Sequence, residues 1–154
     1  MANTYTQIYI QVVFAVKGRQ NLIKEQFRNE LQKYITGIVS NRGQKLISIF
    51  CMPNHTHLLV GIKPNISLSD LVRDIKAGSS GFINQKHWMT TKFSWQEGFG
   101  AFSYSQSQLD DVVHYIEKQK EHHKKASFKE EYKLLLNKFK VDYQDAYLFD
   151  EDEN

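Results

Sequence analysis

Residues 47–62 read Ile47-Ser-Ile-Phe-Cys-Met-Pro-Asn-His55-Thr-His57-Leu-Leu-Val-Gly-Ile62. Two apolar runs flank a Pro-Asn turn, a pattern that predicts two antiparallel strands joined as a hairpin. Because side chains alternate between the two faces of a strand, His55 and His57 point to the same side, one pleat apart. Two imidazoles held in this way are half of a metal site.

Apolar periodicity outlines the elements on either side of this hairpin. Their order is strand, helix, strand, strand, helix, strand and two further helices. The first six match the βαββαβ plan of an α+β, ferredoxin-like sandwich, in which one antiparallel sheet carries two helices on one face. We expect strands over residues 5–16, 45–52 and 55–62, helices over 22–41 and 68–86, strand–bend–strand over 93–104, and helices over 108–124 and 127–140.

The second expected helix has a clear beginning. Ser67 is a suitable N-cap, with Asp70 three residues later in place of the usual capping-box glutamate. Gly78 and Gly81 interrupt the helical pattern, which indicates either a weak helix or the close approach of a neighbouring backbone.

Charge is unevenly distributed along the 154 residues, whose net charge is +3. Residues 142–154 hold six of the 17 acidic side chains and no Lys or Arg, so residues 1–141 carry 20 basic and 11 acidic groups, a net charge of +9. A basic body suits a polyanion such as nucleic acid, although a solubilising surface would look the same. We expect one domain over residues 1–141 and an acidic, disordered tail over 142–154.

Composition excludes several classes of protein. The single cysteine, Cys51, rules out a disulfide framework and is best interpreted as a small buried apolar residue in a cytoplasmic protein. The N-terminus lacks the basic and apolar regions of a signal peptide. No apolar run is long enough to span a membrane.

A second polar motif lies in the helix expected over residues 108–124. Tyr115 and Gln119 are four residues apart, so they share a face of that helix. This spacing places a phenol one turn from an amide oxygen that can bind a metal. His122 and His123 continue toward the same face one turn later.

Each of these residues also has a purely structural interpretation. His55 and His57 are compatible with hydrogen-bonded polar residues at a strand end, and Tyr115 with a core aromatic. Gln119 is compatible with ordinary helix surface. The residues alone leave both interpretations open.

Three motifs occur in a fixed order along the chain: the Pro53-Asn-His55-Thr-His57 hairpin, the segment Trp95-Gln-Glu-Gly-Phe-Gly-Ala-Phe102, and Tyr115-Ile-x-x-Gln119. Together they resemble the single-tyrosine HUH transposases of the simplest bacterial insertion sequences, the IS200-like family. The resemblance extends from about residue 5 to residue 140.

The resemblance implies a metal-dependent DNA transposase, a tyrosine nickase and ligase. The residue matching Tyr115 would attack a phosphodiester in single-stranded DNA, forming a 5′-phosphotyrosine and releasing a 3′-OH. The residues matching His55, His57 and Gln119 would bind a divalent ion, Mg²⁺ or Mn²⁺. The family also implies recognition of DNA hairpins at the element's ends, and a homodimer in which the tyrosine acts in cis or in trans.

The ligand set and the expected chemistry favour different metal ions. Imidazole pairs favour zinc or another transition ion, whereas Mg²⁺ prefers oxygen ligands. Phosphodiester chemistry and the resemblance favour Mg²⁺ or Mn²⁺.

Basic residues outside these motifs are candidates for DNA contacts. The segment 118–140 is rich in lysine and includes Glu121, Glu130 and Glu131, a mixture also typical of a solvated face. The candidate nucleic-acid contacts are Lys17, Arg19, Arg73, Lys76, Lys86, Lys118, His122 and His123.

Three alternative functions remain open at this point. A catalytically inactive or domesticated hairpin-binding protein would not need the tyrosine to react. A replication-initiator nickase of the HUH type shares the His-x-His and tyrosine chemistry but usually carries further domains. A zinc hydrolase would need a third strong ligand and would not need Tyr115.

Overall fold

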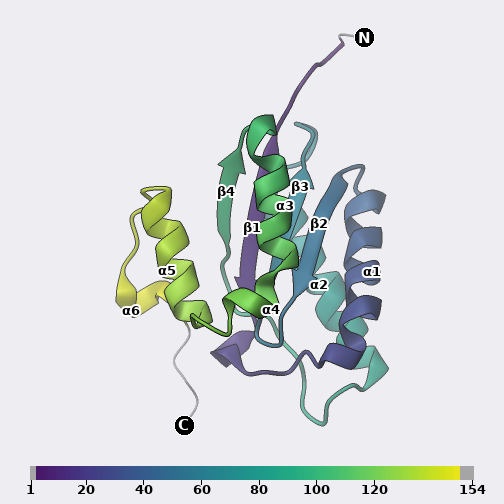
Figure 1. Cartoon of the computed structure of the whole chain (residues 1–154). Helices are drawn as coiled ribbons and strands as arrows, with labels where there is room; N and C mark the ends of the chain where they lie inside the picture. Colours follow the sequence, from purple (N-terminus) through teal and green to yellow (C-terminus); the bar gives the residue numbers. More distant parts are fainter. Residues whose placement is uncertain (1–2, 150–154) are drawn as a thin grey trace.

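Four antiparallel strands form one sheet in the order β2-β3-β1-β4 in a computed structural model that describes residues 3–149 (Figure 1). This strand order confirms the predicted ferredoxin-like α+β fold. The strands are β1 (Tyr9–Ala15), β2 (Lys45–Cys51), β3 (His55–Gly61) and β4 (Gly100–Tyr104). The helices are α1 (Glu25–Asn41), α2 (Leu68–Lys86), α3 (Leu109–Glu117), α4 (Gln119–His122), α5 (Phe128–Lys138) and α6 (Asp145–Leu148), with 3-10 turns η1 (Lys17–Arg19) and η2 (Gln106–Gln108).

Two predicted strands are shorter than expected because they lack partners. β1 begins at Tyr9. Tyr9 pairs with Gly61, the last residue of β3, so the residues before Tyr9 have no strand residue of β3 opposite them. Tyr5, expected in the strand, is 89% exposed. Residues 93–99 form no strand beyond one bridge between Val16 and Trp95, so the prediction of a first strand there was wrong.

The helix predicted over residues 108–124 is broken. Lys118 leaves the helical conformation at φ −100° and ψ 26°, which separates α3 from α4. The amide groups of Glu121 and His122 both bond the carbonyl of Lys118, so a new turn begins there. The break changes the direction in which Gln119 and the residues after it project.

Side chains alternate between the two faces of the sheet along the central strands, so each face has its own apolar core. Val12 and Phe14 of β1 and Leu58 and Val60 of β3 face one side, where α1 and α2 cover them. Cys51 belongs to this core, and burial raises the pKa of its thiol to about 12, as expected of an unreactive buried residue.

The other face of the sheet carries His55 and His57. Here α3 packs on Leu59 through Val112 and Ile116. α5 packs beside it, and its apolar residues lie on β1 and β4; these contacts join Val13, Ala15 and Phe102 to Phe128, Leu135 and Leu136. His55 stacks on Phe128 of α5 and His57 contacts Tyr115 of α3, so both histidines lie on the sheet face that the C-terminal helices cover. α3 lies on the near side of the sheet in Figure 1.

The described part of the predicted tail contains a short helix. Residues 145–148 form α6, where the sequence predicted disorder, and the carbonyl of Leu148 accepts a hydrogen bond from the Gln96 side chain. The rest of the predicted tail, residues 150–154, lies outside the described residues. Within residues 3–149, no helix has the length and apolar character needed to cross a membrane.

α2 begins and packs through polar contacts. The Ser67 hydroxyl accepts a hydrogen bond from the Asp70 amide, which confirms the predicted N-cap. Farther along, the fully buried Ser79 hydroxyl accepts a hydrogen bond from the Trp95 indole at 2.9 Å and donates to the Ile75 carbonyl. Ser79 thereby attaches residues 93–99 to the helix layer.

Ser79→Ala should lower the free energy of unfolding by about 1–3 kcal/mol, because it leaves the buried Trp95 N–H without an acceptor. Urea denaturation followed by circular dichroism measures the change. Ser80→Ala is the matched control. Ser80 is the next residue of the same helix, and its hydroxyl donates to the Ala77 carbonyl. An equal effect of the two substitutions would contradict the assigned role of Ser79.

Candidate active site

The centre of the site is the pair of imidazoles at the start of β3. His55 is 1% exposed and His57 is 0% exposed, so both need polar partners. The Pro53-Asn54 turn supplies the first, because Asn54 Oδ1 lies 2.6 Å from His55 Nδ1. With Nδ1 donating that bond, His55 Nε2 presents a lone pair to the interior of the site.

α3 and α4 supply Tyr115 and Gln119 from either side of the helix break. Gln119 is fully buried, and its Oε1 lies 3.3 Å from His55 Nε2. Its amide nitrogen donates to the Tyr115 carbonyl. The Tyr115 ring lies edge-on to the His57 ring, with centroids 5.8 Å apart. The structure thus brings together the four residues that the sequence singled out as metal ligands and nucleophile.

α5 adds a carboxylate to this group. Glu131 Oε1 lies 2.9 Å from His57 Nε2, 3.2 Å from His123 Nε2 and 3.5 Å from His55 Nε2. Its other oxygen, Oε2, accepts a hydrogen bond from the Tyr115 hydroxyl. Glu131 therefore connects the histidines to the tyrosine.

The sequence left open a solvated face for the segment that contains Glu131, but Glu131 itself is only 6% exposed. A signal was present in the sequence: Phe128, Glu131 and Leu135 follow one another at helical spacing, and all three are buried in α5. An acid on the apolar stripe of an amphipathic helix needs a buried partner. Which partner it meets depends on how α5 docks on the sheet, and local sequence does not specify that.

Burial and neighbouring charges set the protonation states of the site. Desolvation, helped by the neighbouring His57, lowers the pKa of His55 well below its ordinary value. Burial alone would raise the pKa of Glu131, but its contacts with the His123 and His57 side chains hold it far below its usual range. Burial and the Glu131 charge raise the pKa of Tyr115 far above that of a free tyrosine. The site thus holds a neutral imidazole, an ionised carboxylate and a protonated phenol.

A second set of hydrogen bonds supports the histidines from behind. Gln11 of β1 lies fully buried beneath His57, with its Nε2 2.9 Å from His57 Nδ1. The Tyr104 hydroxyl donates to Gln11 Oε1 at 2.7 Å, and burial raises the pKa of Tyr104 to about 12. These contacts orient the His57 ring from the sheet side.

The predicted DNA-contact residues are dispersed. Arg73, Lys76 and Lys86 belong to α2, on the opposite side of the sheet from His55 and His57. Lys76 bonds the carbonyls of Gln96 and Gly98, while Arg73 and Lys86 pair with neighbouring acids. Lys17 and Arg19 lie in η1.

The remaining three candidates lie at the site itself. Lys118 occupies the helix break and is exposed. His122 lies against the Tyr115 ring, with centroids 4.7 Å apart. His123 points inward to Glu131 and Gln119 instead of outward.

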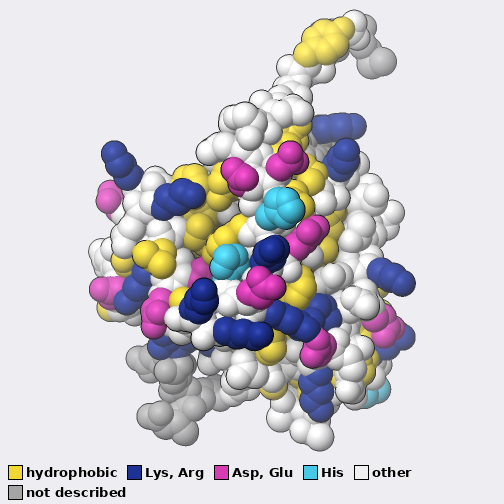
Figure 2. Space-filling view, viewed as in Figure 1, with side chains coloured by type: hydrophobic (Ala, Val, Ile, Leu, Met, Phe, Trp, Pro, Cys, Tyr) yellow, Lys and Arg dark blue, Asp and Glu magenta, His cyan; other side chains and the backbone are white. Residues whose placement is uncertain are grey.

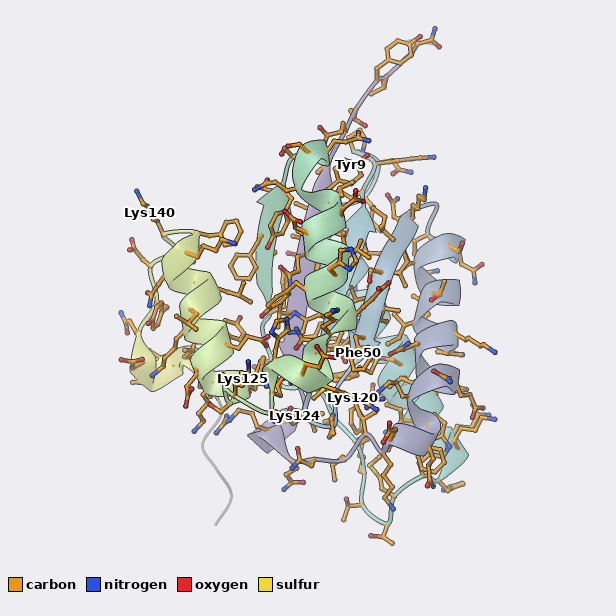
Figure 3. All side chains as sticks on the ribbon, in the orientation of Figure 1. Tyr9, Phe50, Lys120, Lys124, Lys125 and Lys140 are labelled. Atoms are coloured by element: carbon orange, nitrogen blue, oxygen red, sulfur yellow. The ribbon has the colours of Figure 1, made fainter. Side chains whose placement is uncertain are left out.

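The surface around Tyr115 is open and basic. A pocket of about 330 Å³ reaches Tyr115 and Glu131 and is bordered by Lys125 and Lys138. Figure 2 shows Lys and Arg side chains gathered across the lower front of this face. Figure 3, in the same orientation, places Lys120, Lys124 and Lys125 there, at α4 and the loop after it.

The donor set fits a divalent metal ion. His55, His57, His123 and Glu131 each offer one ligand atom, and these atoms lie within 4.8 Å of one another. Gln119 Oε1 lies among them, 3.0 Å from His123 Nε2. Nitrogen ligands, an amide oxygen and a carboxylate together match the preferences of first-row divalent ions.

Known proteins with similar sequences and folds are transposases. The chain is 22% identical over 118 residues to the ISDra2 transposase TnpA of Deinococcus radiodurans, covering 73% of this chain and 84% of that protein. A crystal structure of a Deinococcus radiodurans protein assigned as a transposase matches with a TM-score of 0.59 and 21% identity, over 77% of this chain and 95% of that one.

A second structure shares the fold at the same TM-score of 0.59. It is a REP-associated tyrosine transposase bound to a REP hairpin, 16% identical, and the match covers 80% of this chain and 73% of the other. A profile of the family described as Transposase IS200 like matches residues 4–119, which include His55, His57, Tyr115 and Gln119. The chain therefore belongs to the IS200-like transposase family.

Proposed function

We propose that this transposase cuts and rejoins single-stranded DNA through a 5′-phosphotyrosine on Tyr115, with a divalent metal, Mg²⁺ or Mn²⁺, held by His55, His57 and Gln119. One observation carries the proposal: the Tyr115 hydroxyl bonds Glu131, and the same carboxylate bonds His57. A nucleophile and a set of metal-ligating nitrogens thus meet at one point, as an in-line phosphoryl transfer requires.

The residues divide the chemistry between them. The metal, when bound, would act as a Lewis acid on the phosphate and as a template for attack. Glu131 Oε2 holds the hydroxyl proton of Tyr115 and so fixes the direction of its oxygen. The covalent phosphotyrosine preserves the phosphodiester bond energy, so attack by a 3′-OH can rejoin the DNA without ATP.

The DNA would approach from the open side of α4. The pocket beside Tyr115 can receive the nucleotide next to the scissile phosphate, with Lys125 and Lys138 near its backbone. His122 lines the same pocket and Lys118 is exposed at the helix break, and both remain our candidates for DNA contacts. The relative bound to a REP hairpin supports a hairpin as the recognised element. We expect the enzyme to act in the cytoplasm.

The alternative functions explain fewer of these contacts. A hairpin-binding protein without catalysis would not require Tyr115 to lie against His57. A zinc hydrolase would not require it either. The family match and its coverage of residues 4–119 favour a transposase over a replication initiator.

Tyr115→Phe should abolish the covalent protein–DNA product, by at least about 1,000-fold, because it removes the nucleophilic oxygen. Labelled single-stranded DNA from the flanks of the protein's own gene, incubated with Mn²⁺ or Mg²⁺ and run on a denaturing gel, gives the measurement. Tyr34→Phe on α1 is the control, because Tyr34 lies on the opposite side of the sheet. Undiminished cleavage by Tyr115→Phe would indicate a water-using metal nuclease.

His57→Ala should also eliminate the covalent product, and so should EDTA, since both remove the ion from the phosphate. Hairpin binding, measured by gel shift, should change little, because it depends on basic residues outside the metal site. Restoring Mn²⁺ after EDTA should restore cleavage in the wild type alone. Cleavage that persists in EDTA would eliminate the metal from the proposal.

We also propose a homodimer, since β4 is an edge strand with one free side on which a second copy can pair. Sedimentation velocity at micromolar concentration should give twice the mass of 18.1 kDa.

Tyr115 lies against His57 of the same chain, so we expect it to act in cis. An equal mixture of Tyr115→Phe and His57→Ala should then stay inactive, whereas restored cleavage would establish a tyrosine donated in trans.

A further inference from the structure

His123 is held in a single tautomer by its backbone partner. Its Nδ1 lies 3.0 Å from the carbonyl oxygen of Ala126, which can only accept a hydrogen bond. Nδ1 therefore carries the proton, and in the neutral ring Nε2 presents a bare lone pair. Metal-ligating histidines commonly have this arrangement, in which the distal nitrogen donates to a carbonyl.

The bare nitrogen of His123 faces two oxygens that also present lone pairs. Gln119 Oε1 lies 3.0 Å away and Glu131 Oε1 lies 3.2 Å away. Gln119 directs its amide N–H elsewhere, to the Tyr115 carbonyl. With His123 neutral, three electron-rich atoms thus converge, and either a metal ion or a proton on Nε2 must lie between them.

The spacing of the ligand atoms matches a coordination shell. With metal–ligand bonds of about 2.1 Å, adjacent ligand atoms lie about 3.0 Å apart in an octahedron and about 3.4 Å apart in a tetrahedron. The distances from Glu131 Oε1 to the three imidazole nitrogens run from 2.9 Å, to His57 Nε2, to 3.5 Å, to His55 Nε2, and the ligand atoms of all four residues lie within 4.8 Å of one another. Five donor atoms from three elements, β3, α4 and α5, and from the loop after α4 therefore lie close together.

We propose that His123 and Glu131 are metal ligands, and that with them the site takes a first-row transition ion such as Mn²⁺ in preference to Mg²⁺. Both residues lie beyond residues 4–119, the part of the chain that the family profile matches. Three imidazoles and one carboxylate favour such an ion, since Mg²⁺ prefers an oxygen shell that retains water. The inference rests on the metal site of the proposed function and adds two ligands to it.

Glu131 would then have a second task. Its Oε1 faces the metal site, while Oε2 accepts a hydrogen bond from the Tyr115 hydroxyl. A carboxylate shared in this way ties the position of the nucleophile to the presence of the ion. It also makes the docking of α5 on the sheet part of metal binding.

Mn²⁺ titration followed by electron paramagnetic resonance tests the assignment without DNA or catalysis. Glu131→Gln and His123→Ala should each weaken Mn²⁺ binding by at least about tenfold, the loss typical even of an outer-shell partner. The adjacent exposed residues provide matched controls: Glu130→Gln and His122→Ala should stay within about twofold of the wild type. Mg²⁺ at about 100-fold excess should displace less than half of the bound Mn²⁺.

Spin-echo detection of imidazole nitrogens gives a second readout. The wild type should show coupling to three histidines and His123→Ala to two. Unchanged affinity and an unchanged histidine count in His123→Ala, or unchanged affinity in Glu131→Gln, would overturn the assignment of that residue.

Two further measurements separate other causes of failure. Circular dichroism without metal checks that each variant is folded, so that lost binding is not lost structure. A wild type that binds Mn²⁺ through three histidines but forms no phosphotyrosine would overturn the proposed function and leave the five-ligand site intact. A wild type that binds no Mn²⁺ would overturn the metal site itself.

Discussion

Two buried imidazoles on one face of β3 determine what must cover that face. Neither His55 nor His57 is accessible to solvent, and a buried polar group is costly unless it is hydrogen-bonded. The required partners come from the hairpin turn, β1, α4 and α5. The apolar contacts of α3 and α5 lie on either side of this polar group. Packing and polar satisfaction therefore depend on the same helix positions.

Elements with strong local patterns were predictable from the sequence. The hairpin at residues 53–54, the strand with alternating histidines and the capped helix α2 all depend on neighbours in the chain, and the structure has them within a residue or two of the expected bounds. Strand ends were less predictable, because Tyr5 and residues 93–97 have suitable side chains but no strand opposite them. Pairing is a property of the sheet, and a single segment does not reveal it.

The same difference between local pattern and tertiary contact applies to the candidate site. His55, His57, Tyr115 and Gln119 were recognisable because each pair lies at a spacing that brings it to one face. Glu131 was not, since its partners Tyr115 and His57 are 16 and 74 residues away and meet it only after α5 docks. His123 was expected to contact DNA, but the break at Lys118 turns it toward Glu131. Tertiary placement thus assigned Glu131 and His123 a buried contact that the local pattern did not specify.

The amide of Gln11 lies between a histidine and a tyrosine, and this position allows two opposite hydrogen-bond polarities. With the Tyr104 hydroxyl donating, Gln11 Nε2 faces His57 Nδ1 and the imidazole proton sits on Nε2. If the amide turns over in place, its oxygen accepts from Nδ1, its nitrogen donates to Tyr104, and Nε2 is released as a lone pair. Because every heavy atom keeps its position, β1 and β4 can accommodate both tautomers of His57 without moving. The sheet therefore provides a rigid frame that fits either tautomer of His57, and the direction of the hydrogen bonds reverses as far as the Tyr104 hydroxyl at the end of β4.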